Sequence, residues 1–196
     1  MVDSWLKRNK GWVIAGVIVI ILLLYVVGGY NRFVGLEQNV NGKWSETENQ
    51  YQRQADLIPN LVSVVSSSVS AETKFVKDVV VARSAWDGAS TQLAKDTAGQ
   101  QMNNGITAFV RAVAENYPTL QANKQYVALT DELSGTQNRI TTARGRYIEA
   151  IQSYNVATKR FPANIIAGMF GFSGKEYYQA EEGSLNTPEL GTGELP

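Results

Sequence analysis

Few side chains in this sequence have the types that catalysis requires. The chain contains no histidine and no cysteine, which removes the usual general base near neutral pH, the commonest metal ligand and the thiolate nucleophile. A reaction would have to use carboxylates, lysine, serine or tyrosine alone. We therefore expect no catalytic residues, no bound metal and no cofactor.

The remaining candidates for chemistry lack the required spacing. Asp131 and Glu132 are adjacent, and neighbouring residues on a helix point in different directions. The segment Gly168–Tyr177 contains Gly-Lys, but a phosphate-binding loop needs glycine where Met169 stands and Ser or Thr where Glu176 stands. We interpret the carboxylates as part of a solvated helix face and the glycine-rich segment as a turn.

An uncharged N-terminal segment is the strongest physical signal. Gly11–Asn31 carries no charge, and about 20 apolar residues in a helix span roughly 30 Å of hydrocarbon. Trp12 and Tyr30 lie near its ends, where aromatic rings suit the membrane interfaces. We predict a transmembrane helix at 11–30 after a short basic tail at 1–10. A cleaved signal peptide is the alternative, although no A-x-A-like cleavage site follows.

The charges around this segment predict its orientation. Three basic residues and one acidic residue precede it, whereas Arg32 is offset by Glu37 behind it. The positive-inside rule then places the N-terminus in the cytoplasm and the rest of the chain on the other side. The whole chain has 18 basic and 18 acidic residues, so no net field favours nucleic acid as a partner.

The rest of the chain has helical periodicity. Between Tyr126 and Phe161, apolar residues recur at alternating steps of three and four, which predicts one long helix packed at a shallow angle. Asn123 is placed to cap its start, and Pro162 ends it. The positions of this heptad pattern are Tyr126, Leu129, Leu133, Thr136, Ile140, Ala143, Tyr147, Ala150, Tyr154, Ala157 and Phe161.

Three further helices are expected. A similar pattern from Phe33 to Val69 continues the anchor, with Gly28 and Gly29 as a flexible point. A third helix starts near Glu72, and a shorter fourth ends at Tyr117, before Pro118. The turn between these two is expected in the polar segment 87–105.

The predicted fold class is all-α, with a single N-terminal transmembrane helix followed by an elongated antiparallel four-helix bundle at 31–162. An even number of helices returns the chain to the membrane. There the segment 163–180 is expected to form a hydrophobic C-terminal cap or to lie in the membrane interface. The segment 181–196 is short and acidic, which is typical of a disordered tail.

Pro59 interrupts the second heptad pattern. Proline cannot donate a hydrogen bond to the carbonyl of Ala55 and presses on it. Because the pattern keeps its phase across Pro59, we predict a kink or a recapped joint inside one long helix, with Asp56 capping the restarted part.

Several segments together resemble the LemA family of bacterial membrane proteins. They are Tyr30–Val62, which contains DLIPNLV, then Glu115–Asn155, which contains ELSGTQN, ARGRY and SYN, and finally Phe161–Phe172. The resemblance implies a single anchor and a helical-bundle domain. It supplies a context of membrane proteolysis or envelope maintenance, but no biochemical reaction.

Polar residues in these motifs are candidate contacts, either between helices or with a partner. Asparagine and aspartate inside a helix compete for backbone hydrogen bonds, so their presence needs a reason. The candidates are Asp56, Pro59, Asn60, Asn123, Asn138, Arg144, Tyr154 and Asn155.

Two functions remain open from the sequence. The first is a non-enzymatic, membrane-anchored scaffold or adaptor at the bacterial cell envelope, in the inner membrane. Its expected partners are membrane lipid through the anchor, a second copy of the chain, or an envelope protein such as proteolysis machinery, with no nucleic acid. The alternative is a ligand-binding or carboxylate-based enzymatic module inside the bundle.

Overall fold

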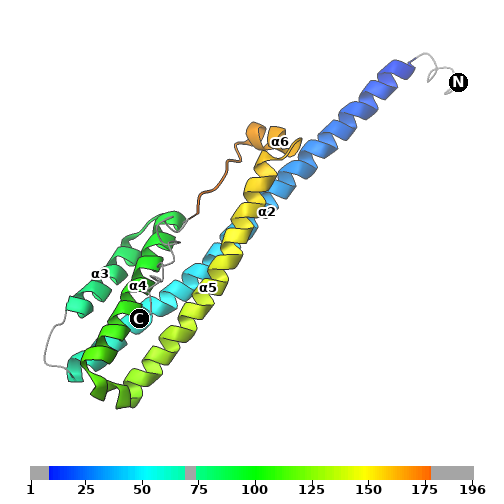
Figure 1. The fold of residues 1–196 in the computed structure, drawn as a ribbon. Helices are drawn as coiled ribbons and strands as arrows, with labels where there is room; N and C mark the ends of the chain where they lie inside the picture. Colours follow the sequence, from blue (N-terminus) through cyan, green and yellow to red (C-terminus); the bar gives the residue numbers. More distant parts are fainter. Residues whose placement is uncertain (1–8, 69–73, 178–196) are drawn as a thin grey trace, which may run out of the picture.

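The computed structural model describes residues 9–68 and 74–177, and this part of the chain contains helices and no strand (Figure 1). The predicted all-α fold class is therefore confirmed. The predicted basic tail at 1–10 lies largely outside the described residues, and the predicted acidic tail at 181–196 lies wholly outside them. The elements are α2 (Lys10–Ser68), α3 (Lys74–Gly88), α4 (Gln92–Asn116), the 3-10 helix η1 (Pro118–Ala122), α5 (Lys124–Lys159) and α6 (Ala163–Phe170).

The bundle is a long helical pair with a shorter hairpin against one end. α2 and α5 run side by side in opposite directions, and the α3–α4 hairpin packs beside the end that is far from the N-terminus (Figure 1). Four helices therefore surround the distal part, as predicted, whereas the part near the N-terminal extension consists of α2, α5 and the short α6. Each part has its own core of buried apolar side chains.

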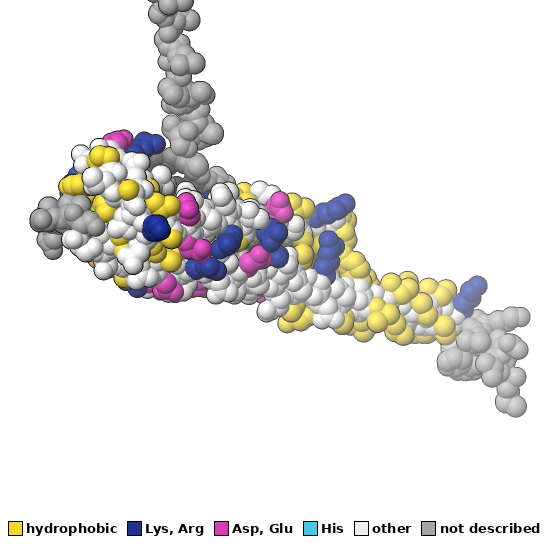
Figure 2. All heavy atoms as spheres, turned by 90° about the horizontal axis from the view of Figure 1, so that it is seen from below, with side chains coloured by type: hydrophobic (Ala, Val, Ile, Leu, Met, Phe, Trp, Pro, Cys, Tyr) yellow, Lys and Arg dark blue, Asp and Glu magenta, His cyan; other side chains and the backbone are white. Residues whose placement is uncertain are grey.

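The N-terminal part of α2, before Phe33, projects out of the bundle. Its side chains from Trp12 to Leu24 are exposed and apolar, and α2 is long and apolar enough to cross a membrane. Figure 2 shows these hydrophobic side chains covering the projecting part of the molecule. α2 passes through Gly28 and Gly29 without a break. The predicted continuity between anchor and bundle is therefore present.

The turn between α3 and α4 is short. It occupies the three residues 89–91, and the Thr91 side chain accepts a hydrogen bond from the Ala94 amide at 3.1 Å, which caps α4. The turn lies inside the predicted segment 87–105, but most of that segment is helix. Its polar composition suggested a loop. Several of these polar residues instead point into the core of the bundle, as described below.

The prediction of a recapped joint at Pro59 was wrong. α2 is a single helix across this residue, and the Asp56 carboxylate accepts a hydrogen bond from the Gln52 side chain at 2.9 Å instead of capping a new helix. Pro59 is on the exposed side of α2. The neighbouring Ala55 and Ile58 are buried, so the apolar face keeps its phase past the proline as predicted.

Candidate functional site

A buried polar network joins three helices in the distal core. Asp96 of α4 is 1% exposed, and the Arg144 Nε–H of α5 donates to both of its carboxylate oxygens, at 2.9 and 3.1 Å. The Tyr51 hydroxyl of α2 donates to Asp96 Oδ1 at 3.1 Å, and the Gln100 side chain donates to the Tyr51 oxygen. One carboxylate therefore fixes the positions of α2, α4 and α5 relative to one another.

A glycine allows this network to form. Gly99 of α4 lies against the Tyr51 ring, and a Cβ built at this position would lie 2.6 Å from two ring carbons. Real Cβ atoms do not come this close to carbon, so an alanine would push the ring and its hydroxyl away from Asp96. The close approach of α4 to α2 thus depends on the absence of a side chain at position 99.

A second buried polar pair lies one heptad further along α4. The Gln54 amide of α2 donates to the Asn103 side chain at 2.8 Å, and both residues are buried. Buried amides of this kind favour one helix register, because any other register leaves them without partners. Together with Asp96, this pair sets the α3–α4 hairpin at one height along the long pair.

The tyrosines of the core remain protonated near neutral pH. Burial and the negative charge of Asp96 raise the pKa of Tyr51 far above its ordinary value, and the same two causes raise the pKa of Tyr147 to about 12. Burial also raises the pKa of Tyr126 and of Tyr154. These hydroxyls can therefore donate hydrogen bonds, but they are poor bases.

The network is arranged for holding helices together. Both oxygens of the Asp96 carboxylate accept hydrogen bonds, and Arg144 balances its charge. Among the described residues, no group of three or more acidic side chains is close enough to hold a metal ion. The chemistry that this arrangement supports is a buried ion pair that stabilises the contacts between helices.

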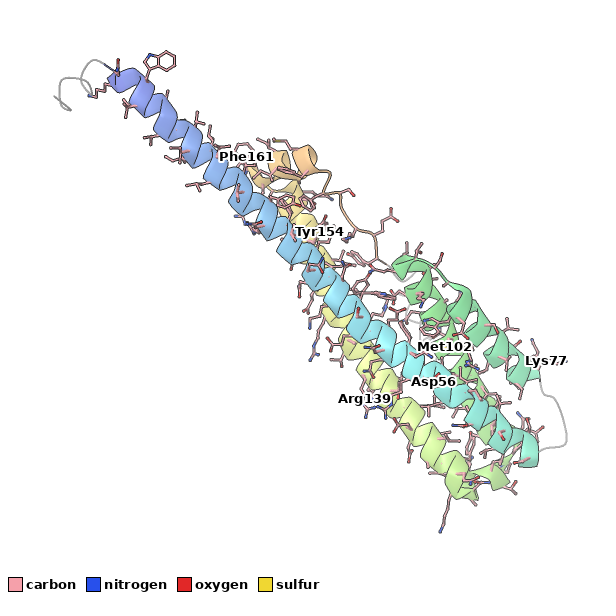
Figure 3. The ribbon with its side chains drawn as sticks, turned by 180° about the vertical axis from the view of Figure 1, so that it is seen from behind. Asp56, Lys77, Met102, Arg139, Tyr154 and Phe161 are labelled. Atoms are coloured by element: carbon pink, nitrogen blue, oxygen red, sulfur yellow. The ribbon has the colours of Figure 1, made fainter. Side chains whose placement is uncertain are left out.

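The eight motif residues predicted from the sequence do not form one site. Arg144 belongs to the buried network, and the Asn123 side chain caps α5 by accepting from the amides of Gln125 and Tyr126. Asp56 and Tyr154 lie far apart along the rod (Figure 3). The exposed members of the set are Asp56, Pro59, Asn60 and Asn138.

Tyr154 and Asn155 fasten the segment that follows α6. The Asn155 side chain accepts from the Lys175 amide and donates to the Lys175 carbonyl, each at 2.8 Å. The Lys175 ammonium lies 5.5 Å from the centre of the Tyr154 ring and 2.9 Å from a Glu37 oxygen. This clamp closes one side of an open groove of about 840 Å³ between α5, the start of α4 and residues 175–177.

α6 closes the membrane-proximal end of the rod. Its Ile166 and Ala167 are buried in the core of this end, and Ile166 sits directly over Gly29, where a Cβ would overlap it. The Tyr30 ring contacts Phe170 and Phe172, and the Phe33 ring stacks on Phe172. Gly29, predicted as part of a flexible point, lies where α2 and α6 approach most closely.

A glycine also ends α6. Gly171 has φ of 77°, the left-handed conformation that a glycine adopts without strain. The Phe172 amide then donates to the Ala167 carbonyl at 2.9 Å, and the chain turns back toward Phe33.

Sequence reasoning missed most of the buried network. Asp96, Gln100 and Asn103 lie in the segment predicted to hold the turn. Tyr51 was predicted only as a position of the apolar pattern from Phe33 to Val69, and Gln54 was not singled out. One signal was present in the sequence. Extending the apolar pattern of α4 backward from Ile106 in steps of three and four reaches Asn103, Gly99 and Asp96, which places these polar residues on the core face of a longer helix.

The chain is similar in sequence to known proteins of one family. A model of the LemA family matches residues 43–190. Magnetosome protein MamQ 2 of Paramagnetospirillum magneticum is 26% identical over an alignment that covers 91% of this chain and 76% of that protein. Magnetosome protein MamQ of Magnetospirillum gryphiswaldense is 24% identical, with coverage of 82% and 70%.

Proposed function

The chain belongs to the LemA family, and we propose that it acts as a non-enzymatic scaffold or adaptor anchored in the inner membrane of the bacterial envelope. The membrane association follows from the family and from the exposed apolar helix at the N-terminus. Its proposed task is to hold a rigid helical surface at a set distance from the bilayer, where a partner protein or a second copy binds.

The unbroken course of α2 carries this proposal. One helix contains both the apolar anchor and the first helix of the bundle, so the bundle cannot swing freely about a linker. At about 1.5 Å per residue, the part of α2 beyond the anchor is about 55 Å long. A rod of this length, with a buried ion pair and a buried amide pair between its helices, is suited to presenting a surface.

The alternative function, ligand binding or carboxylate chemistry inside the bundle, is less well supported. It requires polar groups between helices that are available to a ligand. Asp96, Gln54 and Asn103 do lie between helices, but they are buried, Asp96 is bonded to Arg144, and the Gln54 side-chain nitrogen donates to Asn103. Their geometry favours a structural role.

Crosslinking in living cells tests the scaffold proposal. A photoreactive residue would replace Val81 or Val127, which are exposed apolar residues of the distal bundle. We expect a discrete crosslinked product with an envelope protein, with membrane proteolysis machinery as the first class to test, or with a second copy of the chain. Monomer alone at every exposed position, together with monomer alone in mild detergents, would overturn the proposal.

We also propose that the N-terminus is cytoplasmic and the bundle extracytoplasmic. The sequence has no cysteine, so single cysteines introduced at Ser4 and Val81 report the two sides of the membrane. A membrane-impermeant maleimide should label the cysteine at position 81 in cells with a permeable outer membrane. Labelling at position 4 should require that the inner membrane is opened, and the reverse pattern would contradict this orientation.

A further inference from the structure

α6 carries apolar side chains on two faces. Its inner face, with Ile166 and Ala167, is buried against the bundle. On its outer side Ile165 is 55% exposed and Met169 is 66% exposed, and Phe161, just before the helix, is 76% exposed. The helix sequence ANIIAGMF contains no charge. An exposed apolar surface of this kind needs a covering partner.

The position of α6 indicates what covers it. α6 packs against Gly29 and Tyr30 of α2, which are the last residues of the uncharged apolar segment. If that segment crosses the hydrocarbon, its length of about 30 Å places these residues at the edge of the hydrocarbon. α6 then lies at the level of the lipid headgroups, beside the point where α2 leaves the bundle (Figure 1).

The charges around α6 are complementary to an anionic bilayer. Arg32, Lys159 and Arg160 are exposed, and none of them forms an ion pair with a described residue. Lys175, close by, is neutralised by Glu37. Figure 2 shows Lys and Arg side chains where the hydrophobic anchor meets the bundle. Cations near a membrane surface are attracted to its anionic lipids.

The half-exposed Tyr30 adds an aromatic ring at the same level. Its ring contacts Phe170 at a centroid distance of 5.0 Å. Tyrosine is enriched at the boundary between hydrocarbon and water because it has an apolar body and a polar tip.

We propose that the outer face of α6, with Ile165, Met169 and Phe161, inserts into the headgroup region of the anionic bilayer that α2 crosses. Arg32, Lys159 and Arg160 contact the phosphates around it. This inference rests on the proposed membrane anchor and adds a second attachment to it. Two attachments at different points fix the roll of the rod about the α2 axis, so that one side of the bundle always faces away from the membrane.

Depth-dependent quenching tests this inference on the full chain. An environment-sensitive fluorophore would be attached to single cysteines at Met169 and Ile165, in vesicles of phosphatidylcholine and phosphatidylglycerol that contain lipids spin-labelled at the headgroup or deep in the acyl chain. Cysteines at Ile20, in the anchor, and at Val81, in the distal bundle, are the controls. All four positions are exposed in the protein, so labelling leaves its cores intact.

We expect the headgroup label to quench the probes at positions 169 and 165 at least twofold more than the probe at 81, and the deep label to quench the probe at 20. Quenching at 20 without quenching at 169 and 165 would overturn the α6 inference and leave the anchor in place. Quenching at neither 20 nor 169 would overturn the anchor and this inference together. Crosslinking of 169 to 169 between two chains, without lipid quenching, would show that a second copy covers α6 instead.

Substitution of the three cations provides a second, independent test of this inference. In the variant with Arg32→Gln, Lys159→Gln and Arg160→Gln, we expect the probe at 169 to lose most of its preference for vesicles that contain phosphatidylglycerol. The same emission from the variant and the parent protein in anionic vesicles would contradict the role given to the three cations.

Discussion

Different interactions stabilise the two ends of the rod. The membrane-proximal end packs apolar and aromatic side chains, such as Phe33 and Tyr154, and holds the chain after α6 with one amide clamp. The distal end buries an ion pair and an amide pair among its apolar residues. Apolar packing is tolerant of small shifts, whereas a buried carboxylate is satisfied in one arrangement only.

This difference matches the helices that each end of the rod has to hold in place. At the proximal end, one continuous helix and its antiparallel partner already determine the geometry. At the distal end, α3 and α4 form a separate hairpin that apolar contacts alone would allow to slide along the pair. The Asp96 network supplies the register that the hairpin lacks.

Breaking the buried ion pair has the largest expected effect. Asp96→Ala removes the buried carboxylate that accepts hydrogen bonds from Tyr51 and Arg144, so the free energy of unfolding should fall by about 3–5 kcal/mol. Chemical denaturation in detergent measures this. Replacing both Asp96 and Arg144 by leucine should restore most of the loss, and Glu132→Ala at the exposed pair with Arg53 should cost at most about 1 kcal/mol. An equal loss from both single variants would refute the special role of Asp96.

Alkaline pH should weaken the distal end more than the proximal end. Tyrosine in the unfolded chain ionises near its ordinary pKa of 10.0, whereas the pKa of Tyr147, in the proximal core, is raised to about 12 and that of Tyr51, in the distal core, is raised further. Stability should therefore be constant below pH 10 and fall above it, by up to about 1.4 kcal/mol per pH unit for each such tyrosine.

Denaturation midpoints measured between pH 9 and pH 12 test whether stability falls with rising pH. Tyr51→Phe should reduce the alkaline slope more than Tyr154→Phe, because only Tyr51 bonds directly to a carboxylate. A slope that neither variant changes would show that other groups cause the alkaline loss.

Alanine substitutions at two glycines, one at each end, compare how well the two ends adapt to an added methyl group. Gly99→Ala should cost about 1–3 kcal/mol, because the new methyl group meets the rigid ring of Tyr51. Gly29→Ala meets only the terminal methyl of Ile166, which can rotate away, so its cost should be below about 1 kcal/mol. The control Gly145→Ala meets no atom within 4 Å and should stabilise α5 by about 1 kcal/mol. A larger loss at Gly29 than at Gly99 would reverse the assignment of rigid and adaptable ends.

The effect of replacing Asn155 should be small and local. Asn155→Ala removes both hydrogen bonds to Lys175, and about 1–2 kcal/mol of local stability should be lost. Hydrogen exchange should be faster at residues 172–177 while the helices of the distal end keep their protection. Asn138→Ala, on an exposed face, should change nothing by more than about 0.5 kcal/mol. Faster exchange throughout the chain would mean that Asn155 is not a local clamp.

The helices, including the long apolar N-terminal one, were predictable because their periodicity is strong or their apolar residues are numerous. The α5 pattern from Tyr126 to Ala157 and its cap at Asn123 follow from spacing. The last predicted position of that pattern, Phe161, was wrong, because α5 ends at Lys159 and Phe161 is exposed. The uncharged segment alone predicted the anchor.

The polar core was not predictable by the same reasoning, because composition and burial point in opposite directions there. Asp96 and Asn103 resemble turn residues until their partners Arg144 and Gln54, which are distant in sequence, are brought beside them. Pro59 and Asp56 were also misinterpreted in part, because the tertiary packing of α2 outweighs the local preference for a break. The eight motif residues all belong to segments that resemble the LemA family, but they do not lie together in the fold.

Hydrogen exchange on the full chain in lipid nanodiscs, comparing the parent protein with Asp96→Ala, tests the central claim that the two ends are stabilised independently. We predict that α3 and α4 lose protection by at least tenfold in the variant, while residues 33–44 of α2 and 147–157 of α5 keep theirs. An equal loss of protection along the whole rod would contradict the claim and show that the bundle opens as a single cooperative unit.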